Sequence, residues 1–142
     1  MKQPMTFTAT AESNCGINTL WQVQSQNYNL TCAIPPEFNG PGGGFSPEDL
    51  YIQALMNCFI GTFKVYAENS KLTFEKLNVQ TELTVDTNEF KKTIMKKCHF
   101  IISLNKPSNQ EKADLLIKKV FQSGFILNSV KTEIIFDVQY IS

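Results

Sequence analysis

Apolar residues dominate one long stretch of the chain, residues 50–67, and they fall on almost every side of a helical wheel. The residues before it are typical of a helix start: Ser46 is a good N-cap, Pro47 suits the first helical position, and Glu48 complements the positive end of the helix dipole. We therefore predict a helix over residues 46–69. A helix that is apolar on all sides must be covered on all sides. One chain of this length can cover one side, so we expect the other to lie in a subunit interface.

Alternation of apolar and polar residues predicts strands before and after this helix. We expect short strands over residues 6–10, 20–24 and 28–34, and longer ones over 77–85, 93–104 and 132–140. A second helix is predicted to begin after Ser108, the expected N-cap, with Glu111 completing a capping box, and to stop before Gly124. The order β-β-β-α-β-β-α-β predicts an α+β fold with mainly antiparallel sheet.

The segment between the third strand and the first helix, Pro35–Phe45, holds three of the six prolines and four of the seven glycines. We expect it to form neither helix nor strand. Its glycines, Gly42–Gly44, are not followed by the Lys-Ser/Thr pair of a phosphate-binding loop, so phosphate binding is disfavoured. The segment is instead interpreted as a loop that leads directly into the long helix.

The length of 142 residues fits one domain, which we expect to span residues 1–142. The 13 basic residues, all lysine, balance 13 acidic ones, so bulk charge favours neither nucleic acid nor a membrane surface as a partner. Polar residues interrupt the stretch 50–67, which disfavours a membrane span. The chain opens on Met1-Lys2-Gln3-Pro4 without an apolar leader, so we expect a cytoplasmic protein with reduced thiols.

The four cysteines, Cys15, Cys32, Cys58 and Cys98, show no CxxC pair and no Cys/His ligand spacing, so neither a metal site nor a bound cofactor is expected. Cys32 and Cys98 lie on strand faces and are interpreted as core residues. Cys58 lies within the apolar helix, where a thiol is either inert packing or, beside an opening with charged groups, a nucleophile. His99 has no second ligand type near it in the pattern and is interpreted as structural.

The run from Pro35-Pro36 through the glycines to Ser46-Pro47-Glu48-Asp49-Leu50 and Cys58-Phe59 resembles the OsmC/Ohr superfamily of osmotically inducible and organic hydroperoxide resistance proteins. In that family a similar loop and a Pro-Glu helix start precede a peroxidatic cysteine by the same spacing. The resemblance implies an intertwined homodimer, with sheets wrapped around long central helices. It also implies a cytoplasmic thiol peroxidase of small organic hydroperoxides that uses a thiol reductant. Cys58 matches the nucleophile and Glu48 the carboxylate of the family's Arg–Glu pair.

The chain departs from the family pattern at two positions. It contains no arginine, and the turn that carries the family's Arg has no cation here, Glu12-Ser13-Asn14-Cys15-Gly16. A lysine such as Lys64 would supply a point charge but no bidentate fork. The family's second, resolving cysteine is replaced by Gly124. Resolution of an oxidised Cys58 by Cys15, by Cys98 or by an external thiol stays open.

Helix geometry constrains how Glu48 and Cys58 could share a site. Ten residues separate them by about 15 Å along one helix and by roughly 80° around it. They cannot meet on one straight helix, so a shared site needs a break in the helix or a second subunit.

We therefore predict an OsmC-like, thiol-dependent hydroperoxide reductase of oxidative-stress defence, centred on Cys58, with a weakened or one-cysteine form left open. The alternative is a non-catalytic OsmC-like homodimer that binds a hydrophobic small molecule in its interface pocket. The absent arginine favours the alternative, while the retained Cys58 and Glu48 favour the enzyme. A purely structural dimerisation domain would explain the helix but not the Glu48–Cys58 spacing.

Overall fold

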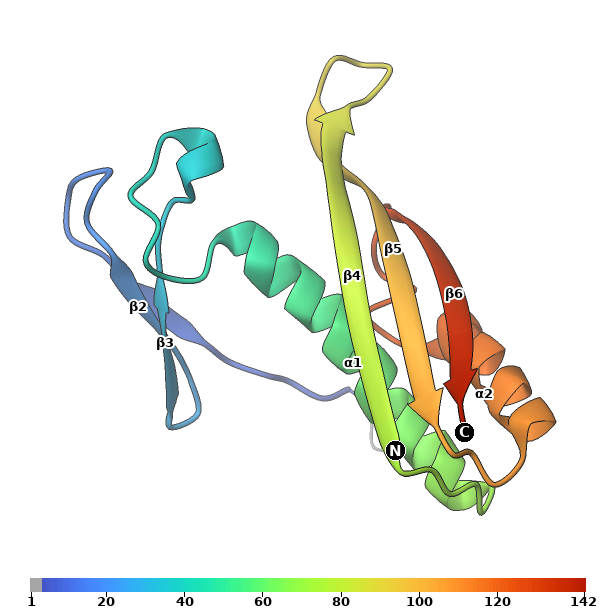
Figure 1. The fold of residues 1–142 in the computed structure, drawn as a ribbon. Helices are drawn as coiled ribbons and strands as arrows, with labels where there is room; N and C mark the ends of the chain where they lie inside the picture. Colours follow the sequence, from blue (N-terminus) through green and yellow to red (C-terminus); the bar gives the residue numbers. More distant parts are fainter. Residues whose placement is uncertain (1–3) are drawn as a thin grey trace. The chain divides into compact units, whose positions relative to one another are not determined.

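The computed structural model describes residues 4–142. Met1, Lys2 and Gln3, part of the segment expected to lack an apolar leader, lie outside the described residues. The chain divides into two compact units, Met1–Tyr51 and Ile52–Ser142. Each unit carries a three-stranded sheet, and the long helix α1 (Pro47–Asn69) begins in the first unit and continues through the second. The predicted α+β fold with two helices and six strands is confirmed (Figure 1).

The first unit contains an antiparallel sheet of β1 (Thr10–Glu12), β2 (Trp21–Ser25) and β3 (Tyr28–Cys32). Val23 pairs with Ala11 on one side and Leu30 on the other, so apolar residues share one face of the sheet. The first strand is not at residues 6–10 as predicted. It starts at Thr10 because only its three residues pair with β2, and alternation without a paired strand does not form a ladder.

The proline- and glycine-rich segment contains one short helical turn, η1 (Pro36–Phe38), which corrects the expectation that it holds no helix. A proline fits the start of a 3₁₀ turn, and Asn39 ends it in the left-handed region at φ 62°. Phe45 then returns to β3: its N–H donates to the Thr31 carbonyl, and the Ala33 N–H donates to the Phe45 carbonyl. The loop is therefore anchored immediately before α1.

The start of α1 is fixed by the predicted N-cap residue. The Asp49 N–H donates to Ser46 Oγ at 3.0 Å, and the Ser46 N–H donates to Asp49 Oδ2 at 2.9 Å. This reciprocal pair satisfies two backbone donors that a helix start would otherwise leave free. It places Glu48 in the first turn of the helix.

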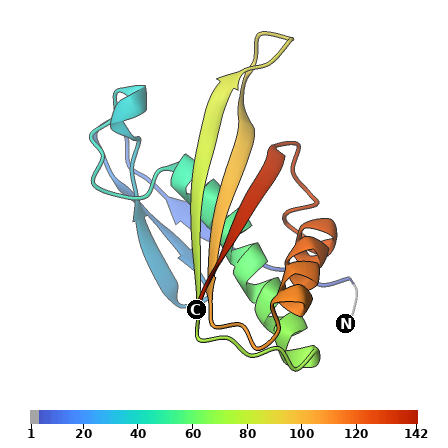
Figure 2. The same cartoon turned by 45° about the vertical axis from the view of Figure 1, so that its right-hand side comes forward.

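The second unit contains β4 (Lys76–Thr87), β5 (Thr93–Asn105) and β6 (Glu133–Ile141), with α2 (Gln110–Ser123) between the last two. β4 and β5 form an antiparallel hairpin, whereas β5 and β6 are parallel because α2 carries the chain back across the sheet. Within this unit α1 and α2 lie on the same side of the sheet, as the two views agree (Figure 2).

The N-cap of α2 is one residue later than predicted. Asn109 accepts a hydrogen bond from the Lys112 N–H at 3.0 Å, whereas Ser108 Oγ accepts one from the Thr73 N–H. Both residue types cap helices well. Ser108 does not cap α2 because its hydroxyl accepts the hydrogen bond from Thr73, a residue far away in the sequence. The local sequence does not reveal this contact.

Aromatic rings form the core of the second unit. Phe59 of α1 is stacked against Phe63 and contacts Phe100 and Phe121, and Phe121 stacks on Phe136 with 4.2 Å between ring centroids. These contacts join α1, α2 and the inner face of the sheet.

Only one stripe of α1 is buried by this chain: Leu55, Phe59, Phe63 and Ala67. Its other side, including Ala54, Asn57 and Gly61, is exposed, so the subunit interface expected there stays a prediction. Among residues 4–142, no helix is both long and apolar enough to cross a membrane.

Candidate functional site

Cys58 lies on α1 next to the fully buried Phe59, and its own side chain is half-buried. The chain segment that approaches its sulfur is the end of α2. A Cβ atom built on Gly124 would lie 3.2 Å from Cys58 Sγ. The position at which the family resemblance places a second cysteine therefore faces the sulfur of Cys58.

The backbone at Gly124 does not itself demand a glycine. Its φ of −63° and ψ of 130° are accessible to any residue. The space is tight, however, because the same Cβ would lie 3.0 Å from Leu127 Cδ1 and 3.0 Å from the Val120 carbonyl oxygen. A side chain there requires its neighbours to shift by a few tenths of an ångström.

Backbone hydrogen bonds hold this glycine in place. Its N–H donates to the Val120 carbonyl at 2.7 Å, and its carbonyl accepts from both the N–H and the Nδ2 group of Asn128. The turn after α2 is thus pinned on both sides of Gly124. These hydrogen bonds fix Gly124 in its place beside Cys58.

Glu48, the second predicted site residue, is half-buried in the first turn of α1. Its Oε1 atom is buried and has no hydrogen-bond partner within the described part of the chain. A buried acceptor without a partner costs about 1–3 kcal/mol. The carboxylate is therefore suited to a donor that residues 4–142 of one copy do not provide.

The other cysteines differ sharply in accessibility, although all four are free thiols. Cys32 and Cys98 are buried as predicted, with exposed fractions of 1% and 0%. Burial raises the pKa of Cys98 to about 11 and also raises the pKa of Cys32. Cys15 is exposed in the first unit. Of these three, only Cys15 is open to solvent-borne reagents.

Lys64, the lysine considered as a replacement for the family's arginine, is exposed on α1. It lies six residues beyond Cys58, which turns it by about 120° around the helix. His99, interpreted as structural, pairs with Asp137 across the sheet, with 2.6 Å between Nε2 and Oδ2. In residues 4–142 no three His, Cys, Asp or Glu side chains gather in a way that could hold a metal ion.

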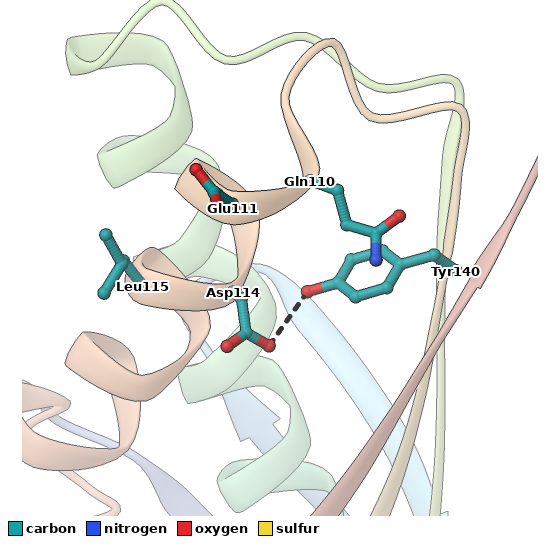
Figure 3. Close-up of a pocket in the computed structure, with 5 residues that line it drawn as sticks. All are labelled: Gln110, Glu111, Asp114, Leu115 and Tyr140. Atoms are coloured by element: carbon teal, nitrogen blue, oxygen red, sulfur yellow. Dashed lines mark hydrogen bonds between the residues drawn. The ribbon is translucent and has the colours of Figure 1, made fainter.

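The structure also contains an open hollow of about 570 Å³, which was not predicted from the sequence. It is lined by Gln110, Glu111, Asp114, Leu115 and Tyr140. Figure 3 shows the ring of Tyr140 reaching from β6 toward α2, where its hydroxyl donates to Asp114 Oδ1 at 3.2 Å. Lys118 Nζ pairs with the other oxygen of Asp114 at 2.9 Å. The sequence alone reveals only the i,i+4 spacing of Asp114 and Lys118 in this hollow.

The tyrosine of this hollow should make stability fall at high pH. Burial raises the pKa of Tyr140 from 10.0 to about 12, with the Asp114 charge adding to the shift. The unfolded chain loses the Tyr140 hydroxyl proton near pH 10, and the folded chain loses it near pH 12. The stability that the neutral Tyr140 contributes is therefore fully present below pH 10 and is lost as the pH rises from 10 to 12. Tyr140→Phe should therefore lose less melting temperature from pH 10 to 12 than the wild type. Tyr28→Phe, at an exposed position, is the control; equal slopes for all three proteins would contradict the assignment.

Comparison with known families gives one match that covers most of the chain. The model of the family described as OsmC-like protein matches residues 40–139. The uncharacterized protein YmaD of Bacillus subtilis is 30% identical over 82 residues, which cover 58% of this chain and 55% of that protein. The uncharacterized protein ACIAD3023 of Acinetobacter baylyi is 27% identical over 74 residues, 52% of each chain. The chain thus spans about half the length of the curated relatives it matches.

Solved structures share the fold over nearly the whole chain. An OsmC-like protein of unknown function from Vibrio cholerae, VCA0330, superposes with a TM-score of 0.85 at 15% identity, covering 96% of this chain and all of that one. The organic hydroperoxide resistance protein OhrB of Bacillus subtilis gives a TM-score of 0.64 at 15% identity, covering 94% of this chain and 98% of that one. At such identities the likeness establishes the fold alone.

Proposed function

The chain belongs to the OsmC-like protein family, and from this premise we propose that it is a thiol-dependent reductase of small organic hydroperoxides with Cys58 as the nucleophile. The observation that carries the proposal is the placement of Cys58. Cys58 is half-buried on α1 beside Gly124, whereas Cys98 is fully buried in the core. A partly accessible thiol in a shaped environment is what a thiol nucleophile requires.

The proposed reaction is a two-electron reduction of the peroxide bond. The thiolate of Cys58 attacks the terminal oxygen of the hydroperoxide, an S–O bond forms and the O–O bond breaks. The alkoxide takes up a proton and leaves as an alcohol, while Cys58 becomes a sulfenic acid. Two thiol hydrogens from a reductant return it to the thiol and release water.

Glu48 is proposed to belong to the same site with its partner group supplied by a second copy of the chain. The two residues lie on one helix, where ten residues separate them by about 15 Å. The unpaired Oε1 of Glu48 supports a donor from outside the chain. A homodimer would bring Glu48 of one copy and Cys58 of the other to one interface. It would also cover the exposed side of α1, where a Cβ on Gly61 meets nothing within 4 Å.

Four free thiols support a reducing compartment, and we extend the proposal to the cytoplasm.

The second candidate function is a non-catalytic dimer that binds a hydrophobic small molecule. One observation favours it: the chain has no arginine to stabilise a thiolate as in the family pattern. The two functions differ in whether Cys58 reacts with a peroxide.

Trapping of the sulfenic acid separates the two functions. The protein is treated with one equivalent of cumene hydroperoxide in the presence of dimedone, and the modified peptide is identified by mass spectrometry. The enzyme hypothesis expects one dimedone adduct per chain, located on Cys58, and cumyl alcohol in equal amount. A protein that returns the hydroperoxide intact and carries no adduct would be the non-catalytic binder.

A further inference from the structure

We propose that the free edge of β6 binds an extended, basic segment of another protein, with one lysine or arginine side chain of that segment in the hollow between β6 and α2. This surface lies within the second unit and does not include Cys58, so the proposal is independent of the proposed peroxidase function. It rests on three observations: the open strand edge, the hollow beside it and the carboxylates that line the hollow.

The first observation is that β6 ends the sheet of the second unit. In the strand order β4-β5-β6 it pairs with β5 alone, and this ladder runs without a register shift from Lys97–Glu133 to Asn105–Ile141. A strand that is paired on one side leaves alternate N–H and C=O groups facing outward. Outside the ladder, the backbone of β6 makes one hydrogen bond to another backbone group of residues 4–142, from the Lys106 N–H to the Ile141 carbonyl. The edge is therefore open to a further strand.

β6 also lacks features by which edge strands usually avoid further pairing. Its sequence contains no proline, glycine or lysine. The other edge strand, β4, begins with Lys76, and its ladder with β5 shifts register between Thr84 and Val85. A lysine and a bulge both disfavour the addition of a strand. The regular edge of this sheet is therefore that of β6.

The second observation is that the hollow of about 570 Å³ lies beside this strand. Among residues 4–142 its lining comes from α2 and from Tyr140 of β6 alone, and the Tyr140 ring points toward α2 (Figure 3). A residue of an added strand directly opposite Tyr140 would point to the same face of the sheet. Its side chain would therefore be directed to the hollow while its backbone pairs with β6. Peptide-binding domains that add a strand obtain affinity from such pairing and specificity from such pockets.

The third observation is the charge of the hollow, which selects the side chain. Glu111 and Asp114 supply carboxylates, and the exposed Leu115 and the Tyr140 ring supply apolar surface. Asp114 is already paired with Lys118, whereas Glu111 forms no ion pair within residues 4–142. Lysine and arginine combine an apolar stem with a cationic end. The stem suits Leu115 and Tyr140, and the charge suits Glu111.

A second copy of β6 fits this edge less well than a basic segment does. In an antiparallel pairing over the full strand, Asp137 would lie opposite Asp137, and directly opposed like charges are destabilising. In the same register Ile134 would lie opposite Tyr140, so the carboxylates of the hollow would gain no cation. Charge complementarity therefore favours a different chain with a basic residue at this position.

Binding of a labelled peptide to the whole chain tests this assignment. The probe is a fluorescein-labelled heptapeptide with threonine at its odd positions and valine, lysine and valine at its even positions, so that lysine and both valines share one face of a strand. Because this pattern reads the same in both directions, it serves either strand orientation. Fluorescence anisotropy should show saturable binding. A peptide with norleucine in place of the lysine should bind about threefold more weakly, as expected for loss of a partly exposed ion pair.

A charge-neutralising variant locates the lysine of the peptide. Glu111→Gln should lower the affinity for the lysine peptide about threefold and leave the affinity for the norleucine peptide unchanged. Glu89→Gln makes the same change in the β4–β5 hairpin turn and should affect neither peptide. Both glutamates are exposed, so both variants should fold, which thermal melting checks.

N-methylation of the peptide tests pairing with the backbone of β6. Methyl groups on one alternate set of amides should abolish binding, whereas methyl groups on the other set should leave it intact, because an added strand directs only one set at its neighbour.

Three results would overturn the inference. The first is a wild-type protein that shows no saturable binding of the lysine peptide at millimolar protein. The second is an equal affinity of the wild type and Glu111→Gln for this peptide. The third is an equal loss of binding from the two sets of N-methylated amides. A hydroperoxide enters none of these measurements, so failure of the proposed function would not change their outcome.

Discussion

Replacing Cys58 by serine is expected to lower the turnover of cumene hydroperoxide with dithiothreitol to the rate of the two reagents without protein. A hydroxyl cannot form the sulfenic acid on which the cycle depends, and loss of a nucleophile commonly costs about three orders of magnitude or more. The replacement is small and the side chain is only half-buried, so the fold should be retained. Consumption of the hydroperoxide is followed directly, and thermal melting confirms that the variant is folded.

The matched control is Cys15→Ser, which makes the same chemical change at an exposed cysteine. It should keep the wild-type rate if no cysteine other than Cys58 takes part in the cycle. A Cys58→Ser protein with wild-type turnover would remove the basis for a thiol mechanism at this position. A slow Cys15→Ser protein would instead point to Cys15 as the resolving thiol.

Truncation of Phe59 to alanine is expected to lower the free energy of unfolding by about 3–5 kcal/mol, the usual cost of removing a large buried aromatic side chain. Phe59 is 0% exposed and its ring contacts those of Phe63, Phe100 and Phe121. The cavity would therefore lie where α1, α2 and β5 meet. Urea unfolding followed by circular dichroism measures the loss.

Phe90→Ala provides the comparison, because this phenylalanine lies in the β4–β5 hairpin turn and is 75% exposed. Its truncation should change the free energy of unfolding by no more than about 0.5 kcal/mol, as is usual at the surface. Equal losses for the two variants would mean that the aromatic cluster around Phe59 does not form the core.

Local signals predicted the helices well because their ends are determined by neighbouring residues. The Ser46–Asp49 exchange of hydrogen bonds fixes the start of α1, and the predicted range of 46–69 differs from Pro47–Asn69 by one residue. Where two capping residues are adjacent, a distant contact decides. Thr73 engages Ser108 and leaves Asn109 to cap α2.

Pairing between strands was less predictable, because it depends on partners far away in the sequence. β1 is limited to the residues that meet β2, and the parallel pairing of β5 with β6 follows from the path of α2. In the candidate site, too, local motifs could be read from the sequence but contacts between distant residues could not. Its residues were identified from a motif, but the approach of Gly124 to Cys58 joins two helices and required the structure.

The bare sheet of the first unit has a consequence for how the chain reaches its folded state. Between residues 4 and 51 the buried residues are Cys32, Ala33 and Ser46, while Tyr28 is 76% exposed and Leu30 41%. Three short strands with so little buried surface are not stable on their own. If a second copy supplies the missing cover, folding of this unit is coupled to association and obeys mass action. Apparent stability would then rise with protein concentration, and newly made chains would stay incompletely folded until they meet.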